Sequence, residues 1–234
     1  RFSYSSSQGN GLLGVGWSVS SGAAISRCSM TVATDEVAKS VQYSVTNDKL
    51  CFNGQRLISL STYGQAGSEY RTELDSFVRV KQYGGNINST ATYFIVEHKN
   101  GVVETYGGTA DAKHSAYGRS ETLTWAISKK EDRASNNIKY SYYQPRVNSG
   151  EHLLRYIRYT GYNGNDGNRV ITYNYGDRNK FSSSYLAGGL TRKTKRLTSI
   201  FTAVDGVLAR KYTFNYNTKS LASGRSLLRN VQEC

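Results

Sequence analysis

Short segments of alternating tyrosine and β-branched residues, joined by Asn-Gly and Asp-Gly pairs, constrain this chain more than any other feature. In YFIVEHKNGVVETY, alternate side chains fall on opposite faces of a strand, and the Asn-Gly pair suits a tight turn of the type I′ class. The predicted hairpins span residues 50–58, 93–106 and 200–216, with turns at Asn53-Gly54, Asn100-Gly101 and Asp205-Gly206. The pattern predicts antiparallel sheet.

Further strands of the same kind are predicted at residues 138–143, 153–159 and 169–175. Residues 66–73, AGSEYRTE, are the one place where a single helical turn is expected. In the second half, polar turns are followed by Tyr-x-Tyr strands at irregular spacing. Repeated hairpins need neighbours to cover their edges, which favours a curved or spiralling sheet that is part of a larger shell.

Composition excludes several other classes. The 234 residues contain 19 tyrosines but a single proline, and the mean hydropathy is −0.55. No apolar run approaches the roughly 20 residues of a membrane-spanning helix, and no 3.5-residue period predicts a coiled coil. We therefore predict one all-β segment over residues 1–234, with a possible division into a glycine-rich hairpin region (1–118) and tyrosine-rich repeats (119–234).

The net charge of +13 is a reason to consider nucleic acid as a partner. The basic residues gather at Arg192-Lys193-Lys195-Arg196 and at Arg210-Lys211, beside tyrosines that could stack on bases. Strand alternation would place neighbouring charges on opposite faces, so we favour solvated or shell-lining charge over nucleic-acid binding. A host-surface or glycan-binding module is a second alternative, although tyrosines in strands pack more often than they bind sugars.

The residues that usually carry catalysis or metals form no recognisable motif. His98, His114 and His152 are the only histidines, and we expect His98 to be a solvated residue at a strand end. Cys28, Cys51 and Cys234 form no CxxC pair, and three buried thiols are favoured over one disulfide. The glycines of GNGLLGVGW lack the strand–helix context of a dinucleotide loop and instead suit a tight bend beneath Trp17. The sequence predicts no catalytic, cofactor or metal site.

The opening segment YSSSQGNGLLGVGWSVSSGAAISRC resembles the N-terminal domain of the virulence-plasmid B protein (SpvB-like) family, shared with B subunits of insecticidal toxin complexes. The matching residues are Tyr4, Ser5, Ser6, Gly9, Asn10, Gly11, Leu13, Gly14, Gly16, Trp17, Ile25, Arg27 and Cys28. Further likeness lies in residues 50–58, 69–77, 125–143, 157–162 and 224–234.

The resemblance implies a structural, non-enzymatic part of a secreted bacterial toxin. In such proteins, sheets related to YD-repeat and Rhs proteins enclose a cytotoxic effector and dock on a pore-forming translocation subunit. The expected partners are the remainder of the same polypeptide or a shell subunit, and the enclosed effector. It also implies that the chain is a piece of a longer polypeptide, that the motif residues are structural, and that the segment does not insert into a membrane.

Overall fold

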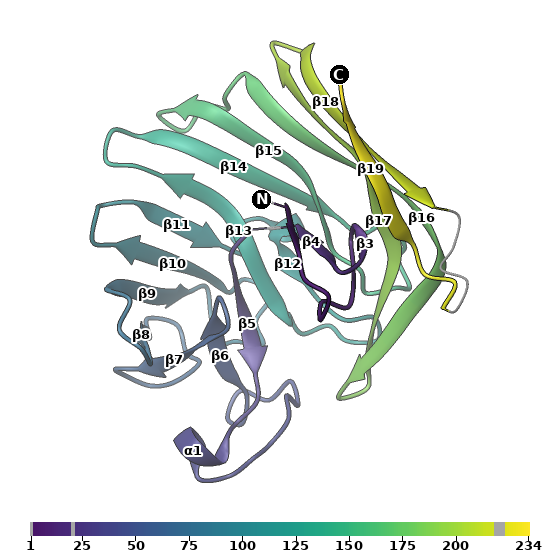
Figure 1. The fold of residues 1–234 in the computed structure, drawn as a ribbon. Coiled ribbons are helices and arrows are strands. Elements are labelled where there is room, and N and C mark those ends of the chain that lie inside the picture. The colour runs from purple at the N-terminus through teal and green to yellow at the C-terminus, as the bar shows by residue number, and fades with distance from the viewer. Residues whose placement is uncertain (1, 20–21, 218–222) are drawn as a thin grey trace.

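The computed structural model describes residues 2–19, 22–217 and 223–234, and these are almost entirely β-structure. Most strands belong to one large sheet in which neighbouring strands run antiparallel. This confirms the predicted fold class. Figure 1 shows the sheet curving strongly, with the N-terminal strands inside the curve.

The first part of the sheet closes on itself. We call strands β5–β11 together with β13 the closed ring, because β13 pairs with β5 at one end of the series and with β11 at the other. The ring strands are β5 (Ala24–Cys28), β6 (Lys49–Phe52), β7 (Gln55–Ser59), β8 (Glu69–Thr72), β9 (Val78–Tyr83), β10 (Tyr93–His98), β11 (Val103–Tyr106) and β13 (Thr124–Glu131). Fully buried Tyr70, Phe94, Tyr106 and Trp125 fill its core.

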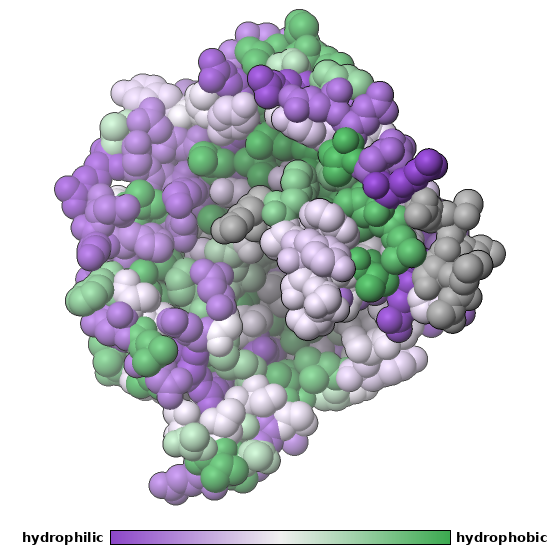
Figure 2. Space-filling model, viewed as in Figure 1, coloured by the Kyte–Doolittle hydropathy of each residue, from purple (hydrophilic) through white to green (hydrophobic). Residues whose placement is uncertain are grey.

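The second part continues from β13 as a sheet that does not close. We call it the open arm; its strands are β14 (Asn136–Tyr143), β15 (Leu153–Tyr162), β16 (Arg169–Leu186), β17 (Gly189–Val204), β18 (Val207–Asn217) and β19 (Leu227–Glu233). Its longest strands, β16 with 18 residues and β17 with 16, are much longer than those of the ring, and the arm forms the curved wall in Figure 1. Hydrophobic side chains gather around the hollow of this view, whereas the rim formed by the ring hairpins is mostly hydrophilic (Figure 2).

Residues 2–19 lie against the concave side of the open arm. They form the short strands β1 (Phe2–Tyr4), β2 (Asn10–Gly11), β3 (Gly14–Val15) and β4 (Trp17–Val19). Leu13 is fully buried with Leu197, Ile200 and Phe214 of the arm, and Trp17 packs beside them. The Leu197 amide donates to the Leu12 carbonyl at 2.9 Å. The N-terminal segment thus supplies part of the arm's core.

The predicted hairpins are present, with one difference in turn geometry. Asn53-Gly54 and Asp205-Gly206 both have positive φ at each residue, as a type I′ turn requires. The third turn is not of this class: only Gly101 has positive φ, and the Gly101 amide donates to the His98 carbonyl at 2.8 Å. Lys99 therefore joins the loop, which makes a three-residue turn that ends in a left-handed glycine.

The remaining strand predictions are confirmed by β14, β15 and β16, but the helical turn at 66–73 is wrong. Residues Glu69–Thr72 form β8, because Tyr70 is fully buried and pairs across the sheet with Val80. The described α-helix is the single turn α1 (Val32–Asp35), and a 3-10 turn spans Ala110–Ala112 before β12 (Lys113–His114). Tertiary packing overrides local propensity at β8.

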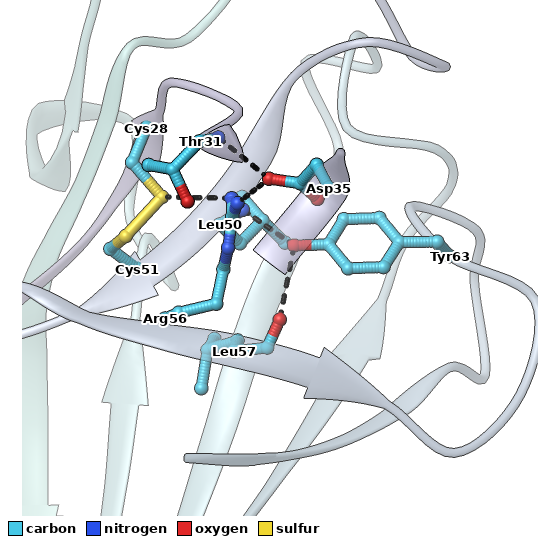
Figure 3. The surroundings of a disulfide bond; sticks show 8 residues. All are labelled: Cys28, Thr31, Asp35, Leu50, Cys51, Arg56, Leu57 and Tyr63. Carbon is cyan, nitrogen blue, oxygen red and sulfur yellow. Dashed lines mark hydrogen bonds and ion pairs between the residues drawn. A yellow bond between two sulfur atoms is a disulfide. The ribbon is translucent and has the colours of Figure 1, made fainter. Parts of the chain in front are cut away.

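The expectation of three buried thiols is also wrong. Cys28 and Cys51 form a disulfide with a Cα–Cα distance of 5.9 Å, and Cys234 is an exposed free cysteine. Pairing of β5 with β6 places Cys51 opposite Ser26, so Cys28 lies diagonally across the ladder within bonding reach. Figure 3 shows the disulfide beside Arg56, whose guanidinium contacts Cys28 Sγ and forms an ion pair with Asp35.

Candidate functional site

The residues of the sequence motif do not form one site. Tyr4 to Trp17 belong to the N-terminal segment on the open arm, whereas Ile25, Arg27 and Cys28 belong to β5 of the closed ring. The motif residues of the N-terminal segment make packing contacts and hydrogen bonds, and those of β5 also form an ion pair and a disulfide. The structure therefore divides the motif between the two parts of the sheet.

Close backbone approach explains two of the motif glycines. A Cβ on Gly11 would lie 2.3 Å from the Trp17 carbonyl oxygen, and a Cβ on Gly14, at φ +95°, would lie 2.5 Å from the Ser226 carbonyl oxygen. Both contacts are with backbone, so a larger residue would displace the chain. The bend beneath Trp17 that the glycines predict is present. Gly9 differs, because a Cβ there would meet no atom within 4 Å.

The other N-terminal motif residues lie at the surface or bind the arm. The Tyr4 ring packs on Trp17 with 5.3 Å between ring centroids, and the Ser5 amide donates to the Gly16 carbonyl at 2.9 Å. Ser6 is exposed in the adjoining turn. Asn10 is bound directly by the arm, because its Oδ1 accepts a 2.9 Å hydrogen bond from Arg178.

Arg178 is a buried cation that sequence reasoning missed. It donates to Asn10 Oδ1, to the Gly11 carbonyl and to the Lys195 carbonyl, all of them neutral acceptors. A bulge between Asp177 and Ser182 breaks the pairing of β16 with β17 and turns Arg178 inward. Burial lowers its pKa, the effect of nearby Glu151 being smaller and opposite. The bulge was not readable from the local sequence.

Glu151 replaces the backbone partners that β17 loses at this bulge. Its carboxylate accepts from the Thr194 amide at 2.9 Å, from the Thr194 hydroxyl at 2.5 Å and from the Lys195 amide at 3.2 Å. A buried amide without an acceptor is costly, so the carboxylate stabilises the interrupted ladder. All these donors come from one short stretch of β17.

The motif arginine of the ring has different surroundings. Arg27 is buried and forms an ion pair with Asp48 at 2.9 Å, and it also donates to the carbonyls of Thr122 and Ile87 and to Asn88 Oδ1. Its guanidinium lies over the rings of Tyr43 and Trp125. Arg27 thus connects several segments around the ring core with its charge neutralised.

The basic residues of β17 take different positions, although alternation does not separate the neighbours Arg192 and Lys193. Lys195 forms an ion pair with Asp177 at 2.8 Å, and Arg196 lies 4.5 Å from the Tyr216 ring centroid. Arg192 and Lys193 instead line a cavity of about 560 Å³ between the β16–β17 hairpin, the N-terminal segment and the start of β15. Arg210 on β18 pairs with Glu233 of β19. The cluster seen in the sequence is therefore not one continuous basic stripe.

Two histidines that line the same cavity contact each other. His114 and His152 stack with 5.2 Å between ring centroids, and their Nε2 atoms lie 2.6 Å and 2.7 Å from the carbonyl oxygens of Gly150 and Asp111. Burial lowers the pKa of His152 to about 4, with His114 adding to the shift, so both rings are neutral at pH 7. His98, expected to be solvated, is half-buried at 3.0 Å from Glu104. Among the described residues no group of His, Cys, Asp and Glu could hold a metal ion.

Many arm tyrosines use their hydroxyls within the protein. The hydroxyls of Tyr142, Tyr175 and Tyr216 donate to the carbonyls of Ile127, Leu154 and Leu197. Burial raises the pKa of Tyr216 to about 12. These contacts are those expected of packing residues.

The edge of the open arm is a further candidate surface. β19 pairs with β18, and among the described residues no strand pairs with its other side. Lys211 and Cys234 exchange both backbone hydrogen bonds, so alternation directs the backbone N–H and C=O groups of Val231 and Glu233 away from β18. Val231 is 46% exposed, which leaves this stretch accessible to another strand. Within the described residues, no helix has the length and apolar character needed to cross a membrane.

Comparison with known families gives a match over most of the chain. The family described as "Salmonella virulence plasmid 65kDa B protein" matches residues 1–195. The mono(ADP-ribosyl)transferases SpvB of Salmonella choleraesuis and Salmonella typhimurium are each 27% identical over 161 residues. The match covers 59% of this chain but 26% of each relative, so the chain spans about a quarter of their length.

Solved structures share the fold. The N-terminal domain of the effector protein SpvB from Salmonella typhimurium superposes with a TM-score of 0.79 at 19% identity, over 100% of this chain and 92% of that one. The TcdB2-TccC3 crystal structure has a TM-score of 0.78 at 16% identity, and the Tc holotoxin pore of Photorhabdus luminescens has 0.77 at 16%. Each covers 98% of this chain, which corresponds to 14% of the larger chain.

Proposed function

Because this chain belongs to the Salmonella virulence plasmid 65kDa B protein family, we propose that it is a structural segment of a bacterial toxin complex. In this role it forms part of a β-sheet shell that encloses a cytotoxic effector and helps to deliver it. The motif residues hold the wall together, as the packing of Trp17 and the hydrogen bonds of Arg27 support.

The open edge of the arm is the observation that carries this proposal. The outward backbone groups of Val231 and Glu233 offer hydrogen bonds to a further strand. A strand added there would extend the curved sheet in the direction in which it already runs from β13 to β19 (Figure 1). The added strand comes from the same polypeptide or from a shell subunit, and the completed wall surrounds the effector.

The segment acts by enclosure and carries out no reaction. Its relatives are named as mono(ADP-ribosyl)transferases, but the similarity covers a quarter of their length. We place ADP-ribosyl transfer and similar activities in separate segments of such toxins. A secreted location agrees with the Cys28–Cys51 disulfide, since disulfides persist in oxidising surroundings. Docking of the shell on a pore-forming subunit completes the proposed delivery route.

Proline substitution at the open edge tests the assembly. Val231→Pro removes an amide that points away from β18, so it preserves the fold but prevents a further strand from pairing. In the assembled toxin complex we expect this variant to leave the effector open to protease. Lys99→Pro is the matched control, since Lys99 is exposed at the second position of a turn that accepts proline.

Hydrogen exchange supplies the direct readout. The amides of Val231 and Glu233 should exchange rapidly in the isolated chain and slowly in the assembled complex. Equal exchange in both states, or full protection of the effector by the Val231→Pro variant, contradicts the proposal.

A further inference from the structure

The cavity near the turn of the β16–β17 hairpin has an unbalanced positive charge. Arg178, Arg192 and Lys193 line it, and Glu151 is the one acidic residue among its described lining residues. The Glu151 carboxylate is already bound to Thr194 and to the Lys195 amide. None of the described ion pairs joins Glu151 to Arg192 or Lys193, and the three cations outnumber this one carboxylate in the lining.

Arg192 has an unused donor at this surface. Its Nε is buried and has no hydrogen-bond partner among the described residues. None of the described hydrogen bonds or ion pairs involves the Arg192 guanidinium, so its terminal nitrogens remain available to an acceptor in the cavity. Arg192 lies opposite Ser183 in the β16–β17 ladder, and Ser183 also lines the cavity. An oxygen acceptor placed there would meet both a guanidinium and hydroxyl groups.

The rest of the cavity favours a ligand with an apolar body. Leu12, Leu123 and Leu153 contribute to its walls, and the stacked neutral rings of His114 and His152 line it as well. Small hydrated anions gain nothing from such walls. A carboxylate with aliphatic or aromatic neighbours would use both the walls and the cations.

Exposed aromatic residues surround the same hairpin. Phe181 and Tyr185 flank the serines that line the cavity and are 60% and 70% exposed, and Tyr117 forms a bridge to Leu190 at the start of β17. Aromatic residues beside arginine are typical of the centres of protein interfaces. A free small molecule would leave these rings uncovered, whereas a polypeptide could cover them.

We propose that this cavity binds an acidic polypeptide segment that carries apolar residues between its carboxylates. One carboxylate occupies the space beside Arg192 and Lys193, while neighbouring apolar side chains contact the leucine walls and the exposed rings. The argument depends on charge complementarity and on the Arg192 guanidinium, which lines the cavity without a described hydrogen-bond or ion-pair partner. It is independent of the open edge at β19, and failure of one proposal leaves the other standing.

Binding of a model peptide tests this inference. The probe is a fluorescein-labelled hexapeptide of alternating glutamate and leucine, followed by fluorescence anisotropy at low ionic strength. We expect saturable binding that weakens with added salt. Replacing the glutamates of the peptide by glutamine should remove binding, because the carboxylate is lost.

Variants of the cavity separate the contributions of charge and shape. Arg192→Gln should weaken binding about tenfold or more, the usual effect of losing one charged hydrogen bond. Ser183→Trp fills the cavity without changing its charge and should abolish binding; because Ser183 is exposed, this variant decides the question even if the first one unfolds. Lys211→Gln, on the exposed surface of β18, is the matched control and should bind as wild type does.

Three results would overturn the proposal. These are unchanged affinity in both cavity variants, equal binding of the glutamine peptide, and displacement of the probe by inorganic phosphate at the concentration at which unlabelled hexapeptide displaces it. The Val231→Pro variant, which blocks the edge, should bind the peptide normally.

Discussion

The closed ring and the open arm differ in how the backbone hydrogen bonds at their strand edges are satisfied. Every ring strand has a partner on both sides, and large side chains such as Trp125 fill the enclosed core. The arm has longer strands, one side of β19 unpaired by any described strand, and a concave face that residues 2–19 partly cover. The ring therefore satisfies its own backbone, whereas the arm leaves hydrogen bonds and surface available for other chains.

Two buried arginines show the same contrast in charge. Arg27 in the ring has Asp48 as an ion-pair partner, whereas Arg178 in the arm is held by neutral oxygens. Unbalanced buried charge is expensive unless hydrogen bonds or distant charges offset it. The charge of Arg27 is neutralised inside the ring, whereas the arm retains the charge of Arg178 near the surface where we place a partner.

The largest expected loss of stability comes from removing a large side chain from the core of the ring. Trp125→Ala should lower the free energy of unfolding by about 3–5 kcal/mol, because Trp125 is fully buried and its indole donates to the Thr92 carbonyl. Trp17→Ala, on the half-covered arm, should cost clearly less. Guanidinium denaturation of both variants measures the difference, and equal losses would remove the distinction between ring and arm.

Loss of the disulfide should weaken the ring next. Replacing Cys28 and Cys51 by serine releases a link between residues 23 positions apart and should cost about 3 kcal/mol. Thermal unfolding with and without reductant gives the same comparison in the wild-type chain. Cys234→Ser serves as the control, since the exposed Cys234 is free. A wild-type unfolding midpoint that does not change with reductant would contradict this prediction.

Acid should weaken the arm through His152. Its pKa is about 4 in the folded chain and near 6.5 when unfolded, so below pH 6.5 the unfolded chain binds more protons. Stability should therefore fall as pH decreases from 6.5 to 4, by about 1 kcal/mol over the first unit, and change little through this group below pH 4. Urea denaturation at several pH values measures the slope, which His152→Gln should reduce. An unchanged slope in that variant would assign the effect to other groups.

The smallest effect compares two matching turns. Gly54 in the ring and Gly206 in the arm have φ near +80°, and a Cβ at either position would meet no atom within 4 Å. Substitution by alanine should cost roughly 1 kcal/mol in each case, from backbone strain alone. Local hydrogen exchange in both variants tests whether ring and arm unfold as one unit. A loss of protection confined to the altered part would show that they unfold separately.

Local sequence patterns predicted the strands and turns well, but they did not predict that β5–β11 and β13 close into a ring. The pairs Asn53-Gly54 and Asp205-Gly206 specify their own turn geometry. Pairing of Tyr106 with Ile127, which closes the ring, depends on an intervening segment that contains no strong signal. The disulfide was missed for the same reason, because Cys28 and Cys51 become neighbours only once β5 and β6 have paired.

The candidate surfaces could be predicted only in part from the sequence. The basic run indicated residues 192–196 as notable, yet only the β16 bulge and Glu151 determine which of these charges remain unpaired. Arg178 is one arginine among many in the sequence, and its partner Asn10 lies 168 positions away. Contacts at such separation leave no local periodicity, so the sequence alone could not place them.

The position of residues 2–19 has a consequence for folding during synthesis. These residues are synthesised well before their partners Arg178, Leu197, Phe214 and Ser226. The ring can form as soon as β13 has been synthesised, while Leu13 and Trp17 stay without their native cover until the arm is complete. Residues 2–19 thus reach their native packing only after the later-synthesised arm has folded.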